Sequence, residues 1–252
     1  MSRRFEELAF SETPMGELTL RRRRDPQLGV DVYEVKLGEE FLMSSLFTVA
    51  EVELARLGLG AVEGDDLEVV VGGLGLGYTA RAALDDSRVA SVTVVEALPE
   101  VIDWHREDLL PATAGLAADP RLRLVHADFF AAVASGEGFD AGYDVEPDAE
   151  SDIADDVEPP GRVVDGVLLD IDHSPRHLLH PSHVPFYTAA GLASLRRLIR
   201  LGGVFALWSD DPPDPDVETV LAEVFDRTES HVVDFPNPLT GGTSANTVYV
   251  AT

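Results

Sequence analysis

The strongest local signal of chemistry in the sequence is the run Gly72-Gly73-Leu74-Gly75-Leu76-Gly77. It follows the apolar residues 67–71 and precedes a helical pattern. Glycine lets the backbone approach a ligand closely, and the N-terminus of the following helix carries a partial positive charge. We therefore expect Gly73, Gly75 and Gly77 to border a bound ligand. A tight strand–helix turn without a ligand is the alternative.

An acid stands at the end of the next expected strand. Residues 89–95 are rich in β-branched side chains, and Glu96 follows them, nineteen residues after Gly77. A carboxylate at this point of a strand–loop–helix–strand unit accepts hydrogen bonds from ribose hydroxyls. Glu96 and the adjacent Ala97 are therefore predicted to bind a nucleoside ligand. NAD stays open as that ligand, because Gly75-x-Gly77-x-x-Ala80 also fits the dinucleotide pattern.

A second acid follows the third expected strand, residues 122–126. Asp128 and Phe129 come directly after it in the turn His126-Ala127-Asp128-Phe129. A carboxylate here can accept a hydrogen bond from an adenine amino group, which favours an adenosyl ligand. A plain helix-capping role for Asp128 is the alternative.

Two acids and a histidine follow the fourth expected strand, residues 163–169. Asp170, Asp172 and His173 lie in one turn at the carboxyl edge of the sheet, where doubly wound folds bind their ligands. We predict that this group is catalytic. His173 or Asp172 would act as the base that removes a proton from the substrate that accepts a transferred group. Asp170 would orient this acceptor or the tail of a bound cofactor. A purely structural role is the alternative.

The elements that position these residues alternate between strands and helices. Further strands are expected at residues 204–208, 231–235 and 247–250, and helices at residues 99–109, at 185–200 and after the N-cap Asp214. This order predicts an α/β fold, with a Rossmann-like, doubly wound, mostly parallel sheet and helices on both faces.

A small β segment is expected before this domain. Residues 1–47 contain alternating stretches with turn signals at Thr13-Pro14-Met15-Gly16 and Asp25-Pro26. The domain itself spans residues 48–252. It opens with a predicted capping box, in which Thr48 is the N-cap and Glu51 is the N3 residue.

Residues 137–158 interrupt the alternation. They contain ten Asp or Glu residues and no Lys or Arg. Such a composition is typical of a disordered or solvated insertion, which we expect to exchange its amide hydrogens rapidly. A lid or a partner-binding segment is the alternative.

Composition limits the function classes. The chain has 252 residues, no cysteine and a net charge of −27, so disulfides and thiolate metal sites are excluded and no metal site is predicted. The charge argues against nucleic acid as a partner, and the only basic run, residues 21–24, is interpreted as a solvated strand end. No signal peptide or apolar run of membrane-spanning length is seen, so we expect no membrane association and a cytoplasmic location.

The motifs VVVGGLGLG, VTVVEALPEVI, HADFF and LLDIDHSP resemble the spermidine synthase family of polyamine aminopropyltransferases, and more broadly the class I S-adenosylmethionine-dependent methyltransferases. The resemblance runs from about residue 30 to 210. It implies an adenosyl cofactor with Glu96 on the ribose and Asp128 near the adenine. It also implies that residues 170–173 lie beside the reacting sulfonium, and it suggests a homodimer.

Three positions depart from the family pattern. Gly75 stands where the family carries an Asp that meets the aminopropyl ammonium, His173 stands where the family has its catalytic Asp, and the family's Tyr-His-Glu segment is absent near residues 41–45. A donor that keeps its carboxylate could instead meet backbone N–H groups of the loop. We therefore expect S-adenosylmethionine to bind at least as well as its decarboxylated form.

Three functions follow from these residues. The first is methyl transfer from S-adenosylmethionine to a small-molecule acceptor. The second is aminopropyl transfer from decarboxylated S-adenosylmethionine to an amine, with methylthioadenosine as product and with Asp170 and Asp172 holding the cationic substrate. The third is a non-catalytic scaffold that binds an adenosyl compound.

Overall fold

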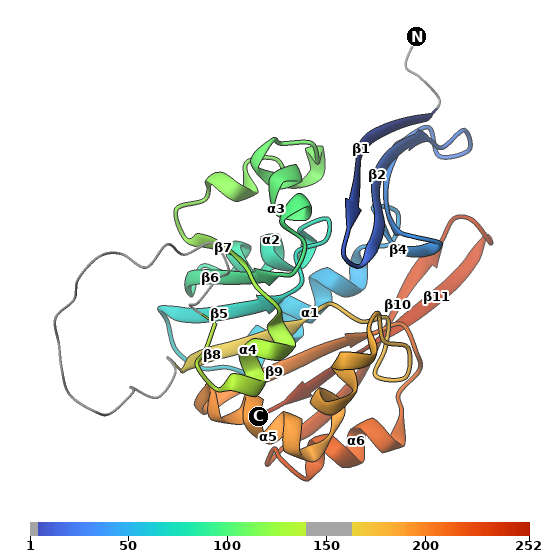
Figure 1. The fold of residues 1–252 in the computed structure, drawn as a ribbon. Helices are drawn as coiled ribbons and strands as arrows, with labels where there is room; N and C mark the ends of the chain where they lie inside the picture. The colour runs from blue at the N-terminus through green and yellow to red at the C-terminus, as the bar shows by residue number, and fades with distance from the viewer. Residues whose placement is uncertain (1–4, 140–162) are drawn as a thin grey trace, which may run out of the picture.

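The computed structural model describes residues 5–139 and 163–252. Within them, a seven-stranded sheet has the order β10-β11-β9-β8-β5-β6-β7, in which the five strands from β9 to β7 are parallel and β10 and β11 run antiparallel (Figure 1). The strands are β5 (Leu67–Gly72), β6 (Val89–Glu96), β7 (Leu122–His126), β8 (Val164–Leu169), β9 (Ile199–Ser209), β10 (Thr228–Asn237) and β11 (Gly242–Ala251). The expected α/β class and mostly parallel sheet are confirmed.

Helices cover both faces of this sheet (Figure 1). One face packs on α1 (Val49–Gly60), α2 (Tyr78–Asp85) and α3 (Pro99–Arg106), and the other on α4 (Phe129–Ser135), α5 (Ala189–Arg197) and α6 (Pro215–Ala222). Successive side chains of a strand point to opposite faces, so Val69 and Val71 enter the first core and Val70 enters the second. Both cores are apolar, which explains the continuous hydrophobic run of β5. Short 3₁₀ helices complete the fold: η1 (Pro111–Thr113), η2 (Leu116–Ala118) and η3 (Pro181–Tyr187).

The N-terminal β segment forms a separate antiparallel sheet of the order β1-β2-β3-β4. Its strands are β1 (Phe5–Thr13), β2 (Gly16–Arg24), β3 (Asp31–Leu37) and β4 (Glu40–Ser44). The expected turns lie where Thr13 pairs with Gly16 and where Asp25 accepts hydrogen bonds from the backbone N–H groups of Gln27 and Leu28.

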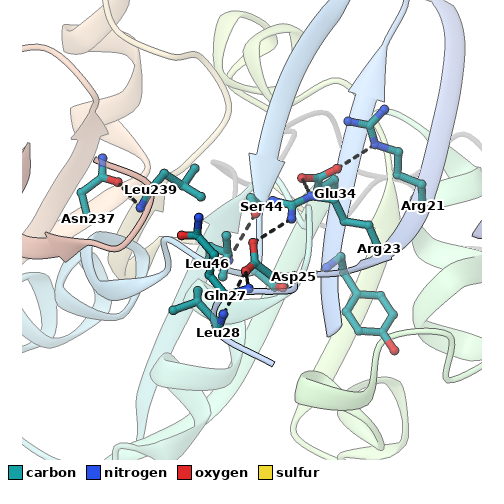
Figure 2. A network of polar contacts seen from close by, with 12 residues as sticks. Arg21, Arg23, Asp25, Gln27, Leu28, Glu34, Ser44, Leu46, Asn237 and Leu239 are labelled. Atoms are coloured by element: carbon teal, nitrogen blue, oxygen red, sulfur yellow. Dashed lines mark hydrogen bonds and ion pairs between the residues drawn. The ribbon is translucent and has the colours of Figure 1, made fainter. Parts of the chain in front are cut away.

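The arginines of β2 are held by carboxylates. Glu34 is buried and accepts hydrogen bonds from Nε of both Arg21 and Arg23, each at 2.7 Å, and Arg23 also contacts Asp25 (Figure 2). The two remaining arginines of the run pair with Glu6 and Asp31. This run is therefore an internal ion-pair network of the small sheet rather than an open basic patch.

The helix expected over residues 185–200 is shorter in the structure. Pro185 lies in η3, and α5 begins only after Thr188, whose side chain accepts a hydrogen bond from Gly191 N. The apolar pattern then continues into β9, which starts at Ile199. Gly202, with φ of +79°, lies inside β9 and does not stop a helix. Apolar spacing alone did not distinguish the end of the helix from the start of the strand.

The predicted capping box is also wrong in its contacts. Thr48 is the N-cap of α1, as expected, but its side chain makes no capping hydrogen bond. Glu51 is instead 7% exposed and lies in the interior. At α6 the expectation is confirmed, since the Asp214 side chain caps the helix and Pro215 is its first residue.

Most of the acidic insertion, residues 140–158, lies outside the described residues. Its first residues are described, and Phe139 stacks on Phe129 with ring centroids 5.5 Å apart. Among the helices of the described ranges, none is long and apolar enough to cross a membrane.

Candidate functional site

A cavity of about 660 Å³ opens at the carboxyl ends of β5, β6 and β8. Its volume suits a small organic ligand. Residues of the N-terminal sheet and of the β10–β11 hairpin also line the cavity. Eight of the predicted site residues line it: Gly73, Gly75, Glu96, Ala97, Asp128, Phe129, Asp170 and His173.

The glycine loop approaches the chain around it closely. Gly73 has φ of +91°, and a Cβ atom there would lie 2.3 Å from the backbone oxygen of Asp170. Gly75 has φ of +47°, and its Cβ would lie 2.5 Å from Sδ of Met43. Gly77 does not line the cavity; it precedes α2 and packs against His105. Its glycine therefore serves helix packing.

Most backbone N–H groups of this loop already have acceptors. Gly73 N donates to Val95 O, Leu74 N to Glu96 Oε2, and Gly77 N to Leu74 O. Leu76 N points at Sδ of Met43 at 3.2 Å. The N–H groups expected to receive a donor carboxylate are thus engaged within the protein, which weakens the argument for preferring intact S-adenosylmethionine.

Glu96 ends β6 and lies in the cavity wall, where the spacing places it. Its Oε2 accepts from Leu74 N and its Oε1 from Leu98 N, both at 2.9 Å. Burial raises the pKa of Glu96, and the surrounding backbone N–H groups oppose that rise. Backbone N–H groups of the glycine loop and of the turn before α3 therefore fix the Glu96 carboxylate in the cavity wall.

Asp128 combines the two roles considered for it. Its Oδ1 caps α4 by accepting from Phe130 N at 2.8 Å and Ala131 N at 3.1 Å. The residue also lines the cavity, together with Phe129. The cap fixes the orientation of the carboxylate at the end of β7, next to the strand that carries Glu96.

Asp170 and Glu51 form a pair of carboxyl groups in the cavity wall. Oγ1 of Thr79 donates to Asp170 Oδ2 at 2.7 Å. Burial raises the pKa of Asp170 to about 6, while burial and the Asp170 charge raise the pKa of Glu51 to about 8. Two carboxyls that share a site resist simultaneous ionisation, so the pair retains a proton at neutral pH. Sequence reasoning missed Glu51 because its spacing suggested only a helix cap.

Asp172, which the sequence predicts as a possible base, does not line the cavity. It is 2% exposed and accepts three hydrogen bonds. These come from Leu179 N at 2.7 Å, His183 Nδ1 at 2.8 Å and Tyr187 OH at 2.8 Å. The Asp172 carboxylate therefore orients the side chains of His183 and Tyr187.

His173 lies in the cavity wall, with its Nε2 3.4 Å from Glu40 Oε1. Its backbone oxygen accepts from Asp210 N, and burial raises the pKa of Asp210. His177 reaches the same Glu40 carboxylate at 3.3 Å. His173, His177 and Glu40 thus connect β4 to the loop after β8.

The charge of the cavity wall has one sign. The carboxyl-bearing residues that line it are Glu51, Glu96, Asp128, Asp170 and Asp210, and no Lys or Arg lines it among the described residues. Histidines and apolar side chains make up much of the remainder. In the same described ranges no three His, Asp or Glu side chains are grouped to hold a metal ion. The wall is therefore suited to a cationic organic ligand.

Comparisons with known proteins agree with this fold. No family model matches the chain, and the curated proteins contain no match to it. A spermidine synthase in complex with the transition state analogue AdoDATO superposes with a TM-score of 0.69 at 16% identity, over 97% of this chain and 73% of that one. The spermidine synthase of Thermotoga maritima gives the same score and identity, over 97% and 72%. Human methyltransferase-like protein 13 in complex with SAH gives 0.53 at 17% identity, over 81% and 78%. At these identities the likeness is one of fold: the chain shares the fold of these spermidine synthases and, over a smaller part of its length, that of the methyltransferase-like protein.

Proposed function

We propose that this protein is a transferase that uses an adenosyl sulfonium donor, and that it transfers a methyl group from S-adenosylmethionine to a small-molecule acceptor. The observation that carries this proposal is the convergence of Glu96, Asp128 and Asp170 on one cavity. Each lies at the carboxyl end of a different parallel strand, and the glycine loop lines the same cavity. Solved structures of the same fold carry SAH or AdoDATO, which supports an adenosyl ligand.

The residues present fit such a donor. Glu96 would accept hydrogen bonds from ribose hydroxyls, and Asp128 and Phe129 border the same cavity for the adenine. A bound sulfonium supplies an activated carbon next to a good leaving group. The protein's contribution is to orient the acceptor for in-line attack and to accept its proton. Asp170 lies where it can orient either the acceptor or the tail of the donor.

Aminopropyl transfer is a second candidate, favoured by the charge of the cavity wall. Glu51 and Asp170 place two carboxyl groups in that wall, and no described Lys or Arg accompanies them. The ammonium group of an aminopropyl donor would be attracted by the negative charge of this carboxyl pair. The carboxylate of intact S-adenosylmethionine would be repelled by the same charge. Gly75 argues the other way, because the loop lacks an acid of its own.

Calorimetry with S-adenosylmethionine, its decarboxylated form and methylthioadenosine separates the donors. The protein is then incubated with each donor and a panel of amines and hydroxylated metabolites. The masses of the products are measured by mass spectrometry. The proposal predicts binding of intact S-adenosylmethionine at least as tight as that of the decarboxylated form, with products heavier by one methyl group. Aminopropyl products would establish the second candidate, and tight binding without any product would leave an adenosyl-binding scaffold.

A further inference from the structure

His183 is a buried histidine in the wall of the cavity that none of the sequence motifs marks. It lies on η3, is 6% exposed and lines the cavity. Its ring stacks on Phe130 with centroids 3.9 Å apart, and Phe130 lines the same cavity. The ring is thus held in one plane at the edge of the ligand space.

The hydrogen bonds around His183 assign its protonation pattern. Nδ1 lies 2.8 Å from Oδ1 of Asp172, which also accepts from Leu179 N and from Tyr187 OH. Burial and the Asp172 charge raise the pKa of Tyr187 well above its usual range, so Tyr187 stays a donor. An acceptor carboxylate requires the proton on Nδ1, and a neutral imidazole then presents Nε2 as its acceptor atom.

Nε2 is the part of His183 that the rest of the molecule leaves open. Within residues 5–139 and 163–252, no group forms a hydrogen bond or ion pair with it. The titratable groups near the ring are Asp172, Tyr187 and His180, whose ring centroid is 6.0 Å away. His173, by contrast, has its Nε2 beside Glu40. A base must have an accessible lone pair and an orienting partner, and His183 has both.

We propose that His183 is the residue that takes the proton of the acceptor, and that Asp172 and Tyr187 position it. The inference rests on the proposed transfer to a small-molecule acceptor with an N–H or O–H group. The lone pair of the acceptor atom forms the bond to the transferred carbon while the carbon–sulfur bond breaks and its electron pair stays on sulfur. The acceptor's proton moves to Nε2, and the imidazolium is stabilised by the Asp172 carboxylate on its other side.

Kinetics with His183→Gln test this role. We expect the transfer rate to fall by about 10²- to 10⁴-fold, the usual contribution of a positioned base, while S-adenosylhomocysteine binds within twofold of the wild type. The dependence of the rate on pH at the acidic end should change in the variant, because the group that takes up the acceptor's proton is then missing. His231→Gln is the matched control, since His231 lies on β10 outside this cavity and pairs with Glu229. A variant that keeps the wild-type rate or the same low-pH limb overturns the proposal.

The Asp172→Asn variant tests whether Asp172 positions the His183 ring or only stabilises the fold. The imidazolium would lose its carboxylate, so the low-pH limb should move to lower pH and kcat should fall with little change in KM. Loss of fold alone would lower the active fraction without moving that limb. Tyr187→Phe is the milder variant if Asp172→Asn does not fold. It should keep the fold and move the low-pH limb to higher pH, because the Asp172 carboxylate would lose one hydrogen-bond donor.

The protonation pattern is measurable without any transfer. ¹⁵N NMR of imidazole-labelled protein should show His183 with a protonated Nδ1 and an unprotonated Nε2 at neutral pH. An Nε2-protonated His183 overturns the assignment whatever the enzyme transfers. If the wild type transfers to no acceptor but the NMR pattern holds, the proposed reaction fails while the oriented acceptor atom stands.

Discussion

Replacing Glu51 by Gln is expected to stabilise the protein at neutral pH. Glu51 is buried beside Asp170, and its pKa rises from an ordinary 4.5 to about 8. The folded state therefore binds this proton more tightly than the unfolded state. Stability that is present below pH 4.5 is lost as the pH rises towards 8. Gln stays neutral and does not lose it.

The size of the effect follows from the shift. One pKa unit corresponds to about 1.4 kcal/mol, so the ionisation of Glu51 costs roughly 3 kcal/mol at pH 7 and approaches 5 kcal/mol above pH 8. Glu51→Gln should raise the free energy of unfolding by up to these amounts, with little gain at pH 5.

Urea denaturation at pH 5, 6, 7 and 8 measures the gain. Glu53→Gln is the control, because Glu53 lies on the same helix but pairs with Arg56 near the surface. Its difference from the wild type should stay constant with pH. A Glu51→Gln gain that does not grow between pH 5 and pH 8 would refute the view that a buried carboxyl pair shares a proton here.

Further expectations concern the ligand and the supporting structure. Glu96→Ala should weaken adenosyl thioether binding at least tenfold by calorimetry, since a charge-assisted bond contributes about 1.5–3 kcal/mol; unchanged affinity in a folded variant would reject the ribose assignment. Asp165→Ala should lower the free energy of unfolding by about 3 kcal/mol, because buried Asp165 accepts from Glu68 N and pairs with Arg200; a loss below 1 kcal/mol would contradict that importance. Gly75→Ala should cost about 1–2 kcal/mol in the same assay through its positive φ, and a neutral result would show that the loop can relax.

The half of the candidate site that we propose to bind an adenosyl group was predictable because its signals are local. A buried strand, a glycine turn and an acid at the next strand end follow each other in the chain, so Gly73, Gly75 and Glu96 could be placed from spacing. Asp128 was placed too, although its capping role became clear only from the contacts of α4.

The residues of the other half depend on contacts between distant segments. Glu51 has the spacing of a capping residue, and only the packing of α1 against α2 and β8 brings it near Asp170. His183 follows Asp172 by eleven residues through a segment that contains Pro175 and Pro181, a path that no helical or strand period describes. The role of Asp172 could therefore be inferred only from its hydrogen-bond partners in the structure.

The two walls of the cavity have different freedom to change over evolution. The proposed donor side is built from strand ends and from a glycine loop in which a side chain at Gly73 or Gly75 would clash with its neighbours. The facing wall comes from β4 near the start of the chain and from the β10–β11 hairpin near its end, through side chains such as Phe41, Leu42, Phe235 and Asn246. Substitutions there reshape the space for an acceptor without touching the strands that hold Glu96 and Asp170. Under the proposed function, substitutions in the facing wall would change which acceptor fits and leave the donor side unaltered.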